Sequence, residues 1–253
     1  MAIRFADTTA LLELHAGTSA SRSAARQALQ PKDEVATSEH VQREWKRILV
    51  SAVGSLVEAV DNEPDLSAAF ARLGNGYGRT SSQRWRAAAM VTGSAGSFNA
   101  VETKIRGRQL LRGLDSRLRR GVGDVRSSSS CGLAREQPHE GGDGRWRIKD
   151  TCKRGEGICA HESRLGRDVA RWRSGADALA RHEDPALRKM GKTGQEMAAR
   201  PQVRTGVNCY GRTGDLAIAL DCRANELLVT TDASFEVIAQ GMGFTIHRIS
   251  IRT

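Results

Sequence analysis

Hydrophobic and polar positions near the N-terminus follow first the period of a strand and then that of a helix. Residues 2–6 alternate apolar with polar or small side chains, which predicts a short strand. A helix is expected to begin within residues 10–14. Ser38 is a natural N-cap, and the positions after it predict a second helix to about residue 60. Its apolar side chains are spaced three and four apart, as a core-facing stripe requires: Val41, Trp45, Ile48, Leu49, Ala52, Val53, Leu56 and Val57.

The C-terminal part of the chain alternates helix and strand as well. Residues 215–224 predict a helix, and residues 226–231 a strand whose continuous apolar run is typical of a buried parallel sheet. Residues 234–242 predict a helix that Gly243 ends. A final strand would contain Phe244, Ile246, Ile249 and Ile251. Because helices and strands alternate at both ends, the predicted fold class is α/β with a mainly parallel sheet.

Composition narrows the class of protein. The 253 residues suffice for one large domain or two small ones. An apolar run of about eighteen residues, which a membrane span needs, does not occur in the sequence. Asp7 stands where a signal peptide would have its apolar stretch, so we expect a cytoplasmic protein without a membrane partner. Five cysteines at irregular spacing argue against a disulfide framework.

Positive charge is concentrated in the middle of the chain. The sequence has 39 Lys and Arg against 29 Asp and Glu, a formal net charge of +10. Most of this surplus lies in residues 101–200, and it favours a polyanionic partner. Two interpretations of this stretch stay open. It is either a solvated, partly ordered insertion or a surface that contacts phosphate backbones with little sequence specificity.

Four acids lie at the ends of predicted elements or on apolar helix faces, positions where a carboxylate is unusual or can contact a bound ligand. Asp7 and Asp232 each follow a predicted strand, and the carboxyl ends of parallel strands converge on the ligand-binding crevice. Glu44 shares the apolar face of its helix, and Asp215 opens the next apolar helix. Each has a structural alternative: Asp7 and Asp215 as helix caps, Asp232 as a turn residue, and Glu44 as a side chain that tilts towards solvent. Asp221 points about 240° around its helix from Asp215 and is excluded.

Four segments around these acids resemble the PIN domain, a family of metal-dependent nucleases that includes the VapC-type toxins. Residues 5–12 are similar to the family's strand followed by Asp and Thr, and residues 36–44 resemble the stretch that leads to its second acid. Residues 214–219 look like the helix with the third acid. Residues 228–235 are the most specific match, to the family's strand, Thr, Asp and Phe segment.

The resemblance implies a three-layer α/β/α PIN-like fold and an endoribonuclease that uses Mg²⁺ or Mn²⁺. Its metal ligands and catalytic residues would be Asp7, Glu44, Asp215 and Asp232. Thr8 and Thr230 would support them, and Arg212 is a candidate phosphate contact with a solvated loop charge as its alternative. RNA is the expected substrate, and a protein inhibitor (an antitoxin) and a homodimer are compatible partners.

The domain organisation departs from a compact PIN domain. We expect one PIN-like domain over residues 1–253, with residues 1–61 and 201–253 as its core and a basic insertion within about 101–200. Long insertions at loops are thermodynamically tolerable, so the nuclease interpretation stands. The alternatives are a non-catalytic nucleic-acid-binding or scaffold protein with a PIN-like fold, and a nuclease that acts on DNA.

Weaker signals lie in the middle of the chain. Cys152, Cys159 and His161 cluster, but their spacing fits a zinc site poorly, and whether they bind zinc stays open. Residues 189–194 lack the upstream glycine and the preceding strand of a P-loop, which is rejected. Three tryptophans lie among arginines and are either base-stacking or core residues: Trp85, Trp146 and Trp172.

Overall fold

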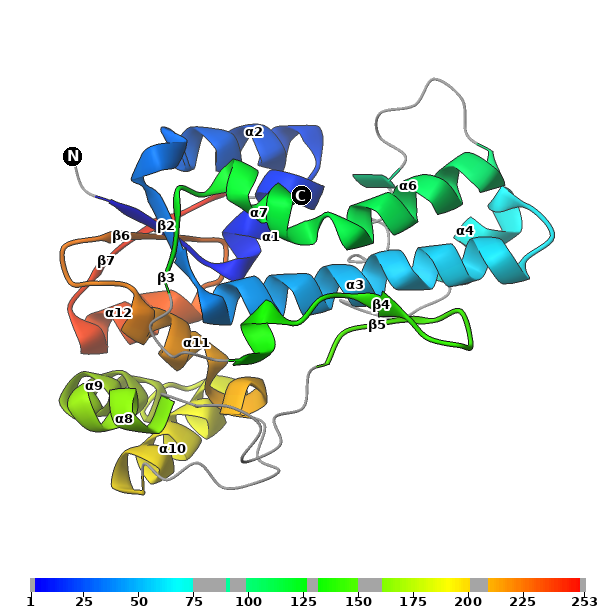
Figure 1. Ribbon diagram of the computed structural model, residues 1–253. Coiled ribbons are helices and arrows are strands. Elements are labelled where there is room, and N and C mark those ends of the chain that lie inside the picture. Colours follow the sequence, from blue (N-terminus) through cyan, green and yellow to red (C-terminus); the bar gives the residue numbers. More distant parts are fainter. Residues whose placement is uncertain are drawn as a thin grey trace.

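The computed structural model describes residues 3–74, 90–91, 99–126, 132–149, 161–200 and 209–250. Over these ranges the centre of the molecule is a five-stranded sheet in the order β3-β2-β1-β6-β7, and every pairing in it is parallel (Figure 1). The expected α/β class with a mainly parallel sheet is confirmed. The strands are β1 (Arg4–Ala6), β2 (Val35–Ser38), β3 (Asp124–Arg126), β6 (Leu227–Thr230) and β7 (Thr245–Arg248).

Helices cover both faces of the sheet and give it three layers (Figure 1). One face carries α1 (Thr8–Ala16), α2 (Ser19–Ala28) and α7 (Leu114–Gly121). The other carries α11 (Cys209–Asp221) and α12 (Ser234–Met242). Outside that second layer lie α8 (His161–Arg167), α9 (Val169–Ala180) and α10 (Pro185–Ala199).

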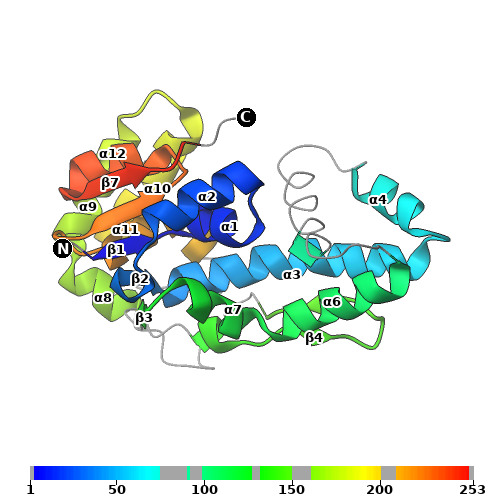
Figure 2. The same ribbon diagram turned by 90° about the horizontal axis from the view of Figure 1, so that it is seen from above.

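The long helix α3 (Glu39–Asn62) begins at the end of β2 and runs away from the sheet (Figure 2). Ser38 is its N-cap and accepts a hydrogen bond from the Val41 amide at 3.4 Å, as the sequence predicts. The helices α4 (Leu66–Gly74) and α6 (Ala100–Arg112) and the β4–β5 ribbon (His139–Glu140 and Trp146–Arg147) pack along α3. Two short 3₁₀ turns, η1 (Lys32–Glu34) and η2 (Gly132–Arg135), complete the described elements.

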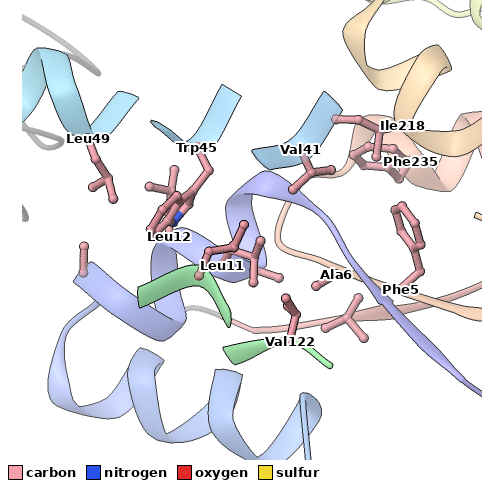
Figure 3. Packing of buried hydrophobic residues seen from close by; sticks show 14 of the residues in the cluster. Phe5, Ala6, Leu11, Leu12, Val41, Trp45, Leu49, Val122, Ile218 and Phe235 are labelled. Carbon is pink, nitrogen blue, oxygen red and sulfur yellow. The ribbon is translucent and has the colours of Figure 1, made fainter. Parts of the chain in front are cut away.

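The core joins segments from the two ends of the chain. Trp45 on α3 packs against Leu11 and Leu12 of α1, and Phe5 on β1 faces Phe235 of α12 (Figure 3). All of these side chains are buried, and Phe5 and Trp45 are fully so. Burial of such large apolar side chains is the main stabilising contribution to a core of this kind.

Several predicted elements are confirmed, and others need correction. The strand over 226–231 is β6, and Gly243 ends α12 with a left-handed φ of 70°, a conformation that glycine adopts without strain. The helix expected over 215–224 begins earlier, at Cys209, kinks at Thr213 and ends at Asp221. The last strand spans Thr245–Arg248, so Phe244 and Ile249 lie outside it, and Ile251 is outside the described residues.

The end of α11 is held by arginines of the neighbouring helices. Arg171 of α9 donates a hydrogen bond to the Cys222 carbonyl at 2.6 Å. Arg164 of α8 pairs with the buried Asp221, whose other carboxylate oxygen lies 3.3 Å from His40 Nδ1. Such contacts satisfy polar groups that a helix end leaves without an intrahelical partner. Asp221 therefore serves the fold, in agreement with its exclusion from the predicted site.

A glycine contact between α9 and α10 gives a test of this packing. A Cβ on Gly191 would lie 2.7 Å from the Ala176 carbonyl oxygen, whereas one on Gly166 would meet nothing within 4 Å. We expect Gly191→Ala to lower the free energy of unfolding by about 1–3 kcal/mol, because the two helix backbones would have to separate. Gly166→Ala, in α8, should leave it unchanged or raise it by about 0.5–1 kcal/mol. Urea denaturation measures both, and equal effects of the two variants would contradict this account.

Candidate functional site

Two of the four predicted acids lie at the same edge of the sheet. Asp7 directly follows β1, and Asp232 follows β6 with one residue between. These strands are neighbours in the sheet, and the Asp7 amide donates to the Val229 carbonyl at 3.1 Å. The strand-end argument from the sequence is therefore confirmed for this pair. In open parallel sheets this edge is where ligands bind.

The carboxylate of Asp7 is buried and held by three donors. Its Oδ1 accepts from the Ala10 amide at 2.7 Å, and its Oδ2 accepts from the Thr230 hydroxyl at 2.7 Å. The Thr9 hydroxyl lies 3.0 Å from both oxygens. Asp7 is thus the N-cap of α1, which was its structural alternative. Burial nevertheless raises the pKa of Asp7 to about 7, with a contribution from Glu44, against the lowering by these hydrogen bonds.

Glu44 and Asp215 approach the site from two helices. Glu44 is half-buried on α3, where the Thr8 hydroxyl donates to its Oε2 at 2.6 Å. Asp215 is half-buried on α11, just after the kink at Thr213. Burial raises the pKa of Asp215 to about 7, and the negative charges of Asp232 and Glu44 raise it further.

Hydroxyl groups link the four acids to the strand ends. Thr230 donates to Asp7 and accepts from the Asp232 amide at 2.9 Å, so its hydroxyl links the ends of β1 and β6. Asp232 also accepts from the Ser234 amide at 2.9 Å, which is its alternative as a turn residue. The Ser234 hydroxyl donates to Asp215 at 2.9 Å.

Two of these hydroxyl residues escape the sequence argument. Thr9 donates to Asp7, and its hydroxyl accepts from the Thr231 amide at 2.9 Å, so it connects α1 with the end of β6. Ser234 lies two residues after Asp232, a spacing at which an Asp side chain commonly bonds to the backbone of its own turn. That spacing, and the paired threonines after Asp7, are the signals from which both residues could have been found.

We call Asp7, Glu44, Asp215 and Asp232 the acid cluster. Their charges act on one another: Glu44 on Asp7, and both Glu44 and Asp232 on Asp215. Among the residues that the structure describes, no Lys, Arg or His forms an ion pair with any of the four. Within the described part of the chain the cluster therefore lacks a paired counter-charge, in contrast to Asp221 with its arginine.

The donor chemistry of the acid cluster suits a hard divalent cation. Carboxylate and hydroxyl oxygens are the ligands that Mg²⁺ and Mn²⁺ prefer. Burial and neighbouring negative charges raise the pKa of Asp7 and Asp215 to about 7, so a bound cation would stabilise their ionised forms. The present side-chain arrangement does not enclose an ion. Within the described ranges, no three Asp, Glu, His or Cys side chains are gathered closely enough to hold one.

Other predicted residues fall partly outside the described structure. The side chain of Arg212 is not among those described, nor is that of His161, and Cys152 and Cys159 lie outside the described residues altogether, as does Trp85. Trp146 and Trp172 are buried, and Trp172 Nε1 donates to the Gly194 carbonyl at 2.8 Å. These two tryptophans are core residues and are not available to stack on bases.

The fold and the acid cluster define an α/β protein with a carboxylate-lined sheet edge. No protein-family model, curated protein or solved structure matches the chain. Among the described helices, none combines the length and the apolar character needed to cross a bilayer.

The buried acids predict an unusual pH dependence of stability. Asp7 and Asp215 keep their protons to about pH 7 in the folded state but lose them near pH 4 when unfolded. The folded state therefore binds more protons between these values, and the free energy of unfolding contributed by these groups falls as pH rises from about 4 to about 7. For Asp7 the fall is about 4 kcal/mol.

Asp7→Asn tests this, because it removes one of the two titrating acids. Urea denaturation at a series of pH values should show a flatter decline for Asp7→Asn than for the unsubstituted protein. Glu236→Gln, on the exposed face of α12, is the control and should keep the original profile. Parallel profiles for Asp7→Asn and the unsubstituted protein would show that Asp7 titrates normally.

Proposed function

We propose that the protein is a metal-dependent nuclease that hydrolyses RNA phosphodiester bonds at the acid cluster. The observation that carries this proposal is the set of four mutually repelling carboxylates at the carboxyl edge of the parallel sheet, without a cationic partner in the described part of the chain. A PIN-like version of the three-layer fold fits the strand order and the resemblance of the four acid-bearing segments.

The residues of the acid cluster would act as metal ligands in this proposal. A bound Mg²⁺ or Mn²⁺ would polarise the phosphodiester and activate the attacking water. The orientation of Asp7 is fixed by Ala10, Thr9 and Thr230, so it would be a ligand held in place before an ion binds. Glu44 is oriented by Thr8 in the same way, and fixed ligands of this kind reduce the cost of binding an ion.

Charge supports a nucleic-acid substrate. The net charge of +10 favours a polyanionic substrate. In this proposal the excess of Lys and Arg in residues 101–200 contacts the phosphate backbone. RNA is proposed as the substrate because of the resemblance to the VapC-type ribonucleases. DNA is the alternative, because we assign no residue to recognition of a 2′-hydroxyl group. A protein inhibitor and a homodimer belong to the same proposal, as does a cytoplasmic location.

A second candidate is a non-catalytic nucleic-acid-binding or scaffold protein on the same fold. It is favoured by one observation: in the described ranges, the side chains of the acid cluster do not close around a point where an ion would sit. The two candidates differ in whether a divalent ion binds and whether a polymer is cut.

Cleavage of labelled RNA and DNA with Mg²⁺, with Mn²⁺ and with EDTA separates these candidates. We expect metal-dependent cleavage of RNA that EDTA abolishes, and a loss of at least about 100-fold in Asp7→Asn and in Asp232→Asn, because each removes a charged ligand. Glu236→Gln should cleave at the original rate. Cleavage that survives in both Asp variants would remove the acid cluster as the site.

The scaffold interpretation has its own signature in the same samples. If no polymer is cut and Mn²⁺ leaves the melting temperature at pH 8 unchanged, the acid cluster does not bind a metal. If the protein is a nuclease, Mn²⁺ should raise the melting temperature, because it binds the folded state only, and Asp7→Asn should reduce that rise.

Salt dependence tests the proposed grip on RNA. If about five phosphates are neutralised, the affinity for single-stranded RNA in EDTA should fall about 100-fold between about 50 and about 200 mM salt. Filter binding or fluorescence anisotropy measures this slope. An affinity that does not change with salt would show that the basic residues do not contact the backbone.

A further inference from the structure

A cavity of about 380 Å³ lies between α1, α2 and α7, away from the acid cluster. Leu14 and Leu29 supply part of its apolar lining, and Gly121 of α7 leaves room beside the His15 ring, since a Cβ there would lie 3.1 Å from His15 Nε2. The rest of the lining is basic. We call this the arginine cavity, and its charged or titratable lining residues are His15, Arg22, Arg26, Lys32, Arg117 and Arg120.

The arginines of this cavity lie close enough to His15 for their charges to affect its pKa. Burial lowers the pKa of His15 to about 3, and the positive charges of four arginines lower it further: Arg117, Arg120, Arg22 and Arg26. Burial also lowers the pKa of Arg117, as do the charges of Arg120 and Arg22. The four guanidinium groups come from two helices that are far apart in the sequence, so the fold gathers like charges that repel one another.

No acidic partner of these cations is found among the described residues. Within the described part of the chain, none of Arg22, Arg26, Lys32, Arg117 and Arg120 forms an ion pair, and no Asp or Glu is among the residues that line the cavity. Arg22 and Arg117 are half-buried, and the other three cations are exposed at the rim of the cavity. Elsewhere in the described ranges most buried or half-buried cations are paired, as Lys46 is with Asp115 at 2.6 Å. Favourable placement at helix C-termini accounts for a cation or two here, but it does not account for five around one cavity.

Two nitrogen atoms of the residues that line the cavity are buried without a hydrogen-bond partner in the described ranges. His15 Nε2 and Arg22 Nε are inaccessible to solvent and have no hydrogen-bond partner. The His15 ring is fixed edge-on against Trp45, with ring centroids 5.3 Å apart, and Arg22 is fixed by a bond from its Nη2 to the Gly17 carbonyl at 3.0 Å. Buried polar groups usually have a partner, so these two atoms leave the wall of the cavity incompletely satisfied.

The chemistry of the lining selects the ligand. Arginine binds phosphate through paired, charge-assisted hydrogen bonds, and a cavity of this volume is of the size that holds a small ligand rather than a length of polymer. Several cations require more than one negative charge on that ligand. We propose that the arginine cavity binds a terminal phosphate or diphosphate group, carried by a free nucleotide or by the phosphorylated end of a nucleic-acid strand.

Binding to the full-length protein tests this proposal. The probes are inorganic pyrophosphate, ATP, and one short single-stranded oligonucleotide with either a 5′-phosphate or a 5′-hydroxyl, all in EDTA so that the acid cluster does not contribute. The test variant is Arg22→Gln with Arg117→Gln. The control is Arg119→Gln with Arg173→Gln, which removes the same charge from exposed positions outside the cavity.

We expect pyrophosphate or ATP to bind the unsubstituted protein at least about ten times more tightly than it binds the test variant. Its affinities for the control variant and for the unsubstituted protein should agree within about twofold. A preference for the 5′-phosphorylated oligonucleotide that the test variant loses identifies a strand end as the source. ATP binding without such a preference identifies a free nucleotide. A cooperative thermal transition in each variant shows that it is folded.

Two outcomes overturn the proposal. One is that pyrophosphate, ATP and the 5′-phosphate add nothing measurable to binding by the unsubstituted protein. The other is that the test and control variants lose affinity equally, which would show a general effect of net charge. Neither outcome depends on whether the acid cluster binds a metal or cleaves RNA.

Discussion

The parallel pairing of β1 with β6 is the contact on which the arrangement of the molecule depends. It joins strands from the two ends of the chain and sets Phe5 opposite Leu228, both fully buried. Just beyond the paired residues, the same alignment brings the Thr230 hydroxyl to 2.7 Å from the Asp7 carboxylate. The strand register therefore positions Asp7 and Asp232, whereas Glu44 and Asp215 are positioned by α3 and α11.

The elements that could be predicted are those with a clear pattern of apolar and capping residues. The helix α3 has an N-cap and a long apolar stripe, and β6 has a continuous apolar run, so both follow from pattern alone. The strand β3 consists of Asp124, Val125 and Arg126, and its place in the sheet comes from backbone pairing with β2. The early start of α11 was missed because its glycines suggested a loop, and the helix absorbs them with a kink at Thr213.

The candidate site divides in the same way. The strand-end rule predicts that Asp7 and Asp232 share an edge, because it needs only the sheet to be parallel. The roles of Thr9 and Ser234 depend on how each turn is closed, which periodicity does not encode. The arginine cavity was beyond prediction, because Arg22 and Arg117 meet only through the packing of α2 and α7 against α1.

The helix α1 connects the two charged regions and explains how one fold accommodates both. Asp7 caps its N-terminus, while His15 in its last turn lines the arginine cavity, about 12 Å further along the axis. The helix dipole favours a negative charge at the first end and positive charges at the second, so each cluster lies where the backbone tolerates it best. Burial, and after it the like charges within each cluster, raise the pKa of Asp215 and lower that of Arg117. The two proposals, a cation bound at one end of α1 and a phosphate at the other, would each supply the counter-charge that the described parts of the chain do not provide.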